Sequence, residues 1–101
     1  MIYNKLVRDR IPEIIEAQGE TPNIRILEQE EYLHRLEAKL DEEVGEYHRD
    51  KNAEELADIL EVIYALAEAN GVARQELMDL YQKKHDARGG FVKRIFLISK
   101  D

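Results

Sequence analysis

Two acidic pairs are the part of this sequence whose residue types and spacing could do chemistry. The segments Glu43-Val-Gly-Glu46 and Glu55-Leu-Ala-Asp58 each place two carboxylates three residues apart in a strongly helical stretch. Residues three apart lie on one side of a helix, so each pair projects together. A short connection makes the two helices antiparallel, which can bring all four carboxylates together. Four carboxylates repel one another unless a cation is bound, and hard oxygen ligands favour Mg²⁺, with Mn²⁺ as an alternative.

The apolar stripes separate these acids from the many others in the chain. At about 100° per residue, Glu43 falls within the margin of the apolar stripe on the first expected helix, residues 30–50. Glu55 falls on the apolar arc of the second, residues 53–70, whereas Glu42 points toward solvent. A carboxylate on an apolar face is costly unless it is protonated, hydrogen-bonded or bound to a metal. This position favours a metal site.

Two simpler interpretations stay open at this stage. Charged residues make up 37% of the chain, so acids three residues apart also arise by chance on solvated helix faces. Asn52 is a suitable N-cap, and Glu55 then occupies the capping-box position, where its carboxylate could bond the Asn52 backbone. Spacing alone does not decide between these interpretations and a metal site.

Composition excludes several classes of protein. A chain of 101 residues is expected to form one domain, residues 1–101. Its 22 acidic and 15 basic residues give a net charge of −7, which argues against a general nucleic-acid binder and against a membrane-surface protein. It has no cysteine, and its three histidines show no ligand spacing. The charged N-terminus lacks the apolar core of a signal peptide, so we expect a cytoplasmic protein.

The periodicity predicts a mainly α fold. Pro12 suits the first turn of a short helix that Gly19 ends, and Gly89-Gly90 ends the last helix. We expect helices at residues 11–18, 30–50, 53–70 and 72–88. Residues 23–27 and 94–98 resemble strands, which predicts a minor two-stranded β-ribbon. The broad apolar faces of the two long helices predict a homodimer or higher oligomer.

Basic residues concentrate outside the acidic helices. Lys84 and Arg88 are four residues apart on one face of the last expected helix, and Lys5, Arg8 and Arg10 lie near the start of the chain. A polyphosphate site requires this division, because acids hold the metal while Lys and Arg hold phosphate oxygens. The alternative is that the cations near a helix C-terminus only complement the helix dipole.

Four segments together carry a family resemblance. They are Tyr3-Asn-Lys-Leu-Val-Arg-Asp-Arg-Ile-Pro12, Lys39-Leu-Asp-Glu-Glu-Val-Gly-Glu46, Glu54-Glu-Leu-Ala-Asp-Ile-Leu-Glu61, and Lys84 to Phe91 with its Arg88-Gly-Gly. In these segments the chain resembles the MazG-like all-α nucleoside triphosphate pyrophosphohydrolases. The first of these segments, Tyr3 to Pro12, also resembles a house-cleaning subgroup of these enzymes that is related to phosphoribosyl-ATP pyrophosphohydrolase.

The resemblance implies a fold, a reaction and a set of ligands. The fold would be a helical bundle that assembles as a homodimer or homotetramer, with sites near the subunit interface. The reaction would be Mg²⁺-dependent hydrolysis of a nucleoside triphosphate to the monophosphate and pyrophosphate, a hydrolase activity on a phosphoric anhydride. The metal ligands, by position, would be Glu43, Glu46, Glu55 and Asp58, and either Glu43 or Glu46 would orient the attacking water.

Two other functions remain open from the sequence. One is hydrolysis of phosphoribosyl-ATP, which is the same chemistry on another substrate. The other is a non-catalytic helical oligomerisation module, although such a module gives no reason to keep acids on an apolar arc.

Overall fold

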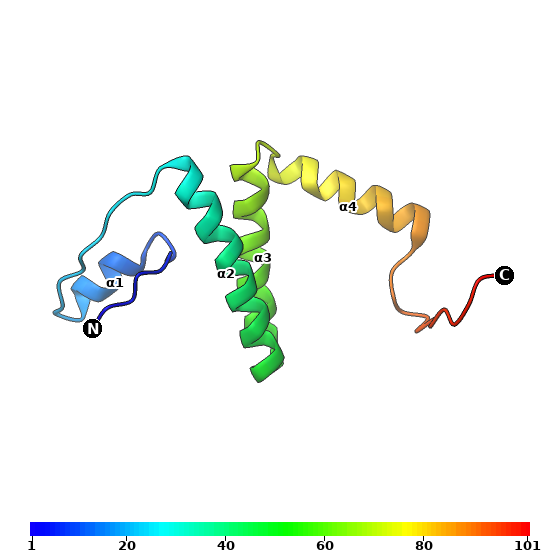
Figure 1. Ribbon diagram of the computed structural model, residues 1–101, viewed down its shortest axis with the longest axis horizontal. Helices are drawn as coiled ribbons and strands as arrows, with labels where there is room; N and C mark the ends of the chain where they lie inside the picture. Colours follow the sequence, from blue (N-terminus) through cyan, green and yellow to red (C-terminus); the bar gives the residue numbers. More distant parts are fainter.

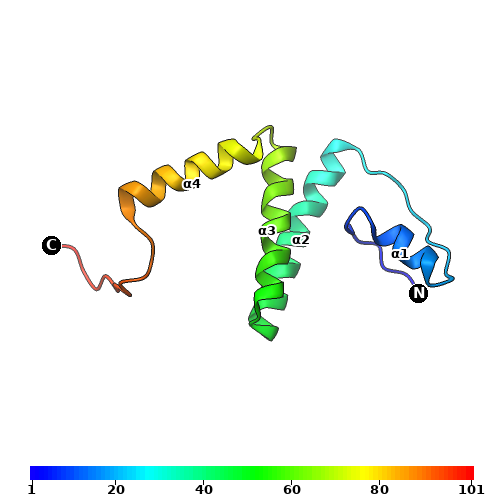
Figure 2. The same ribbon diagram turned by 180° about the vertical axis from the view of Figure 1, so that it is seen from behind.

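The computed structural model describes all 101 residues and contains four α-helices and no strands. α1 spans Ile11–Ala17, α2 spans Gln29–Asp50, α3 spans Ala53–Ala69 and α4 spans Arg74–Arg88. α2 and α3 lie side by side and antiparallel, with α1 on the α2 side and α4 projecting from the far end of α3 (Figures 1 and 2). The predicted mainly α fold, two long antiparallel helices with one helix at each end, is confirmed.

The residues between α2 and α3 explain why the chain reverses there. Lys51 adopts a left-handed backbone conformation, with φ 52° and ψ 39°, and its N–H donates to the Tyr47 carbonyl at 2.7 Å. Asn52 then caps α3, because its side-chain oxygen accepts a hydrogen bond from the Glu55 backbone N–H at 3.1 Å. The predicted N-cap is confirmed, and so short a connection requires an antiparallel hairpin.

The hairpin holds the small core of the chain. Leu36 on α2 and Val62 on α3 are buried, with 3% and 7% of their surface exposed. The rest of the predicted α2 stripe is half-buried against α3: Leu33, Leu40, Val44 and Tyr47. The predicted α3 arc is covered on one side only, and three of its members remain exposed: Leu56, Leu60 and Ile63. These three recur at helical spacing and form one uncovered apolar stripe on α3.

Ion pairs tie the N-terminal segment to both helices of the hairpin. Lys5 Nζ lies 3.4 Å from Glu42 Oε1 on α2, and Arg8 Nη2 lies 2.6 Å from Asp58 Oδ1 on α3. The backbone around Arg8 is not helical, and α1 begins only after it. The segment is therefore held by contacts at the ends of long side chains.

The C-terminal part of the molecule is far less covered. No residue of α4 is buried, and every residue after it is exposed. The molecule measures 61 × 31 × 23 Å and has a Cα radius of gyration of 17.8 Å, whereas a compact chain of this length has about 13 Å. A single chain thus leaves much apolar surface in water, including Phe91, Phe96 and Ile98 in the tail.

The predicted β-ribbon is wrong. Residues 23–27 and 94–98 are irregular and make no strand hydrogen bonds. They lie on opposite sides of the hairpin, so neither segment meets the other (Figure 1). An alternating pattern supplies the right side chains for a strand, but the backbone groups also need a partner at hydrogen-bonding distance.

The helix limits otherwise follow the sequence closely. α4 begins at Arg74, later than the predicted residue 72, because Gly71, with φ 81°, and the two residues after it form the turn. No helix combines the length and the apolar character needed to cross a membrane.

Candidate metal centre

The hairpin brings the two acidic pairs together. α2 supplies Glu43 and Glu46, and α3 supplies Glu55 and Asp58, each offering one oxygen within 4.8 Å of the other three. We call these four residues the acidic cluster. Oxygens on opposite sides of a cation with bonds of about 2.0–2.6 Å would lie about 4–5 Å apart. The predicted convergence is therefore observed, at a spacing suited to a divalent cation.

Glu43 is the deepest member of the acidic cluster. Only 9% of its side chain is exposed, and its Oε1 lies 3.4 Å from Lys39 Nζ, one helical turn away. Its other oxygen, Oε2, is buried without any hydrogen-bond partner, and so is Oε2 of Glu55. Buried polar atoms in folded proteins almost always have a partner. Two buried carboxylate oxygens without a partner distinguish this cluster from ordinary solvated acids and would suit cation ligands.

The capping alternative does not account for Glu55. Its backbone N–H is capped by Asn52, but its carboxylate makes no hydrogen bond back to the Asn52 backbone. The side chain instead turns toward the acidic cluster.

The electrostatics of the cluster point the same way. Burial raises the pKa of Glu43, the adjacent Glu46 carboxyl raises it further, and Lys39 acts in the opposite direction. Burial also raises the pKa of Glu55, and nearby carboxylates, Glu46 first among them, add to that effect. The charged forms of Glu43 and Glu55 are thus disfavoured in the chain alone. A divalent cation would favour that form, and four oxygen donors with no nitrogen or sulfur suit Mg²⁺ or Mn²⁺.

Cations from the N-terminal segment lie at the edge of the cluster. Arg8 bonds Asp58 and also places Nη1 3.5 Å from Glu61 Oε1. Lys5 pairs with Glu42, which also pairs with Lys39 and stays outside the cluster, as its predicted orientation requires. Arg8 and Lys5 are thus brought close to the cluster.

Arg10 is not brought to the cluster, since it bonds Glu13 within its own segment.

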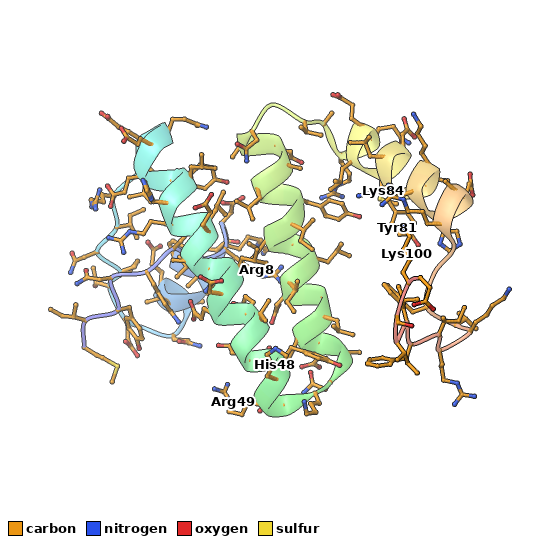
Figure 3. All side chains as sticks on the ribbon, turned by 45° about the vertical axis from the view of Figure 1, so that its right-hand side comes forward. Arg8, His48, Arg49, Tyr81, Lys84 and Lys100 are labelled. Atoms are coloured by element: carbon orange, nitrogen blue, oxygen red, sulfur yellow. The ribbon has the colours of Figure 1, made fainter.

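Lys84 and Arg88 are not brought to the cluster within one chain. Both lie on α4, where they line a shallow hollow of about 590 Å³ together with Leu77, Leu80 and Tyr81. Figure 3 shows Lys84 and Arg8 well apart, with Lys84 on the α4 side of the hairpin. The role of these two cations in phosphate binding stays a prediction.

Sequence reasoning did not single out two side chains that the structure adds to this region. Lys39 contacts Glu43, and its spacing of four residues on one helix could have shown this in advance. Glu61 contacts Arg8 across 53 positions of sequence, and no local pattern signals a contact of that kind.

Comparison with known proteins identifies a relative over part of the chain. No protein-family model and no solved structure matches the chain. A stretch of 42 residues, 42% of this chain, is 64% identical to an uncharacterized protein of Mycolicibacterium smegmatis (strain ATCC 700084 / mc(2)155). The matched stretch spans 43% of the length of that relative.

Proposed function

We propose that this chain is a Mg²⁺-dependent nucleoside triphosphate pyrophosphohydrolase of the MazG-like type, acting in the cytoplasm. The observation that carries the proposal is the buried, unpartnered oxygen of Glu43 within a cluster of four carboxylates. The sequence resemblance described above supports the choice of reaction and of the α–β phosphate bond.

The proposed roles follow from the surroundings of each carboxylate. Glu43, Glu46, Glu55 and Asp58 would hold the cation. When bound, the cation would neutralise phosphate charge and make a water molecule more acidic. Glu43 is fixed by Lys39 on one oxygen and has the other free, which suits a ligand. Glu46 forms no ion pair with a basic side chain of this chain, so it is the better candidate to accept a hydrogen bond from the attacking water.

A second copy of the chain would complete the site. On α4, Lys84 and Arg88 continue the stripe of Leu77, Leu80 and Tyr81 at helical spacing, so any surface that covers the stripe also meets the two cations. The exposed stripe on α3 is a surface of matching character. We propose a homodimer or homotetramer in which α4 of one copy covers the hairpin of another. That arrangement would set the two cations beside the partner's acidic cluster, where they would bind phosphate oxygens.

A product assay tests the reaction. The purified protein is incubated with Mg²⁺ and a panel of standard and damaged nucleoside triphosphates, with phosphoribosyl-ATP included, and the products are separated by chromatography. We expect a nucleoside monophosphate and pyrophosphate. Release of orthophosphate would contradict the assigned bond, and turnover of phosphoribosyl-ATP alone would favour the alternative substrate. If the protein is oligomeric and turns over none of these compounds even with Mg²⁺ present, the non-catalytic module is favoured.

Amide variants test the site at nearly constant side-chain size. Glu43→Gln and Asp58→Asn each remove a negative ligand, and we expect activity to fall by more than about 100-fold, since even residues that only support a metal ligand contribute about 10–100-fold. Glu54→Gln, one residue from Glu55 but exposed and outside the cluster, is the matched control and should keep most of the activity. Full activity in Asp58→Asn would exclude the assigned site.

A further inference from the structure

The N-terminal segment places a positive charge directly on the acidic cluster. Arg8 Nη2 lies 2.6 Å from Asp58 Oδ1, and the same guanidinium reaches Glu61 at 3.5 Å. Asp58 is the only one of the four cluster residues that Arg8 contacts. One oxygen of Asp58 is therefore engaged by a cation of the protein itself.

This contact is weak enough to be exchanged. The side chains of Arg8 and Asp58 are 53% and 39% exposed, and ion pairs with that exposure contribute little because water screens them. A divalent cation that engages four carboxylates at once gains far more from Asp58 than Arg8 does. The two cations would also repel each other if both remained on the same carboxylate.

The backbone around Arg8 allows the side chain to move. Lys39, the other cation at the cluster, stands within α2 and is fixed one turn from Glu43. Arg8 precedes α1 in a non-helical stretch, so it can leave Asp58 without breaking a helix. The Lys5–Glu42 ion pair holds the same segment against α2, which keeps a released guanidinium near the cluster.

We propose that Arg8 and the divalent cation compete for Asp58, and that Arg8, once displaced, binds the phosphate group of the substrate. This inference rests on the proposed function, because it requires the acidic cluster to hold a cation. The planar guanidinium matches two oxygens of a phosphate as well as it matches a carboxylate. Arg8 thus offsets the charge of Asp58 before the metal binds and contacts the anion afterwards.

The test measures binding and does not depend on turnover. Calorimetry gives the affinity for Mn²⁺ alone, and then the affinity for inorganic pyrophosphate at saturating Mn²⁺. Arg8→Met removes the charge and keeps the length of the side chain. Arg10→Met is the matched control, because Arg10 lies in the same segment and bonds only Glu13.

The expected signature is a pair of changes with opposite sign. Arg8→Met should bind Mn²⁺ roughly two- to fivefold more tightly, because the competing ion pair is gone. It should bind pyrophosphate at least about tenfold more weakly, because one charge-assisted contact is lost. Arg10→Met should match the wild type in both measurements. Arg8→Lys keeps the charge but loses the planar guanidinium. Its affinities for Mn²⁺ and for pyrophosphate should both fall between those of the wild type and Arg8→Met.

Other results overturn the proposal. Unchanged or weaker Mn²⁺ binding in Arg8→Met and in Arg8→Lys would exclude competition for Asp58. Unchanged pyrophosphate binding would exclude the phosphate contact. If Mn²⁺ binds the wild type and is lost in Glu43→Gln while the Arg8 variants behave as wild type, only this inference fails. If the wild type binds no Mn²⁺, the proposed function fails with it.

Discussion

The α2–α3 hairpin and the region formed by α4 and the tail differ in how much of their apolar surface one chain covers. All three buried residues of the molecule, Leu36, Glu43 and Val62, lie in the hairpin. α4 has none, and apolar residues in the tail such as Phe91 and Ile95 are almost fully in water. Both regions carry apolar residues at helical spacing, so composition does not explain the difference.

The difference shows which parts of the fold one chain can complete. The hairpin gains burial from two helices that the short connection forces together, and its acidic cluster forms as a consequence. α4 is held near the hairpin by the turn after α3 and by Tyr64 of α3. The Tyr64 ring lies 3.9 Å from the Arg74 guanidinium, and its hydroxyl donates to Met78 Sδ at 3.6 Å. Leu80 and Tyr81 of the α4 stripe nevertheless stay exposed. An uncovered apolar face of this kind marks a site of association. The four proposed metal ligands thus lie in the hairpin, whereas Lys84 and Arg88, two of the predicted phosphate ligands, lie on the helix whose apolar face one chain leaves exposed.

A pair of leucine truncations gives the largest expected effect and tests the comparison directly. Leu36 is 3% exposed and Leu80 is 56% exposed. Leu36→Ala should reduce the free energy of unfolding by about 2–5 kcal/mol, because it leaves a cavity in the core. Leu80→Ala should change the unfolding of the hairpin by no more than about 0.5 kcal/mol. Chemical denaturation followed by circular dichroism measures both.

The Leu80→Ala variant also tests whether α4 is covered in an oligomer, when protein concentration is varied. If α4 covers a second copy, Leu80→Ala should weaken the oligomer, which light scattering over a dilution series would show. A wild-type protein that stays monomeric at all concentrations would mean that α4 remains uncovered in solution. The partition of the molecule into two regions would then hold, but the proposed assembly would be wrong.

The sequence predicted the hairpin and its cluster well because both depend on local rules. The apolar stripes, the cap at Asn52 and the short connection together determine which faces of α2 and α3 meet. Once those faces meet, the positions of Glu43 and Glu55 on them follow from helical geometry alone. The four proposed ligands could therefore be named from the sequence, although burial of their oxygens could not.

The parts that sequence reasoning did not provide depend on contacts between distant segments. The strand pattern of residues 94–98 was recognisable, but the absence of a pairing partner was not. The contact of Arg8 with Asp58 joins residues 50 positions apart, and nothing in either neighbourhood indicates it. The position of α4 relative to the cluster depends on the turn at residues 70–73, on the contacts of Tyr64 with Arg74 and Met78 and, in our proposal, on another chain. Local periodicity contains no information about any of these.

Mixing two defective variants tests whether the two regions act together across a subunit boundary. Arg88→Ala should raise the free energy of the transition state by about 1.5–3 kcal/mol, the value of one charge-assisted contact, and kcat/KM should fall accordingly. Glu43→Gln should abolish activity through the cluster. A mixed dimer would contain one site with intact Glu43 from one chain and intact Arg88 from the other. Activity should therefore rise when the two variants are co-refolded, as measured by pyrophosphate release.

Two outcomes of the mixing experiment would contradict the shared site. No gain in activity, with mixed oligomers confirmed by mass spectrometry, would place both residues in the same chain's site or remove Arg88 from it. An Arg88→Ala enzyme with kinetics within about twofold of wild type would leave Arg88 as a cation that only complements the end of α4.

The smallest expected effect is a pH dependence that belongs to the hairpin alone. Because the pKa of Glu43 is raised in the folded chain, the folded state binds more protons than the unfolded state between the two pKa values. Stability from this group is fully present below the unfolded pKa, about 4.3, and is lost as pH rises through the folded pKa. Glu43→Gln, measured with EDTA from pH 4 to 8, should have a melting temperature that exceeds the wild type by a margin that grows with pH.

Glu31→Gln provides a control of opposite sign. The hydrogen bond from Arg25 lowers the pKa of Glu31, so its contribution is present above the unfolded pKa and is lost as pH falls. The melting temperature of Glu31→Gln should drop below the wild type increasingly as pH rises, and Mg²⁺ should not alter that trend. Saturating Mg²⁺ should reverse the Glu43→Gln advantage, because a cation that binds only the folded wild type stabilises it by mass action. If Mg²⁺ leaves the difference between Glu43→Gln and wild type unchanged, Glu43 is a buried acid of the hairpin core and not a metal ligand.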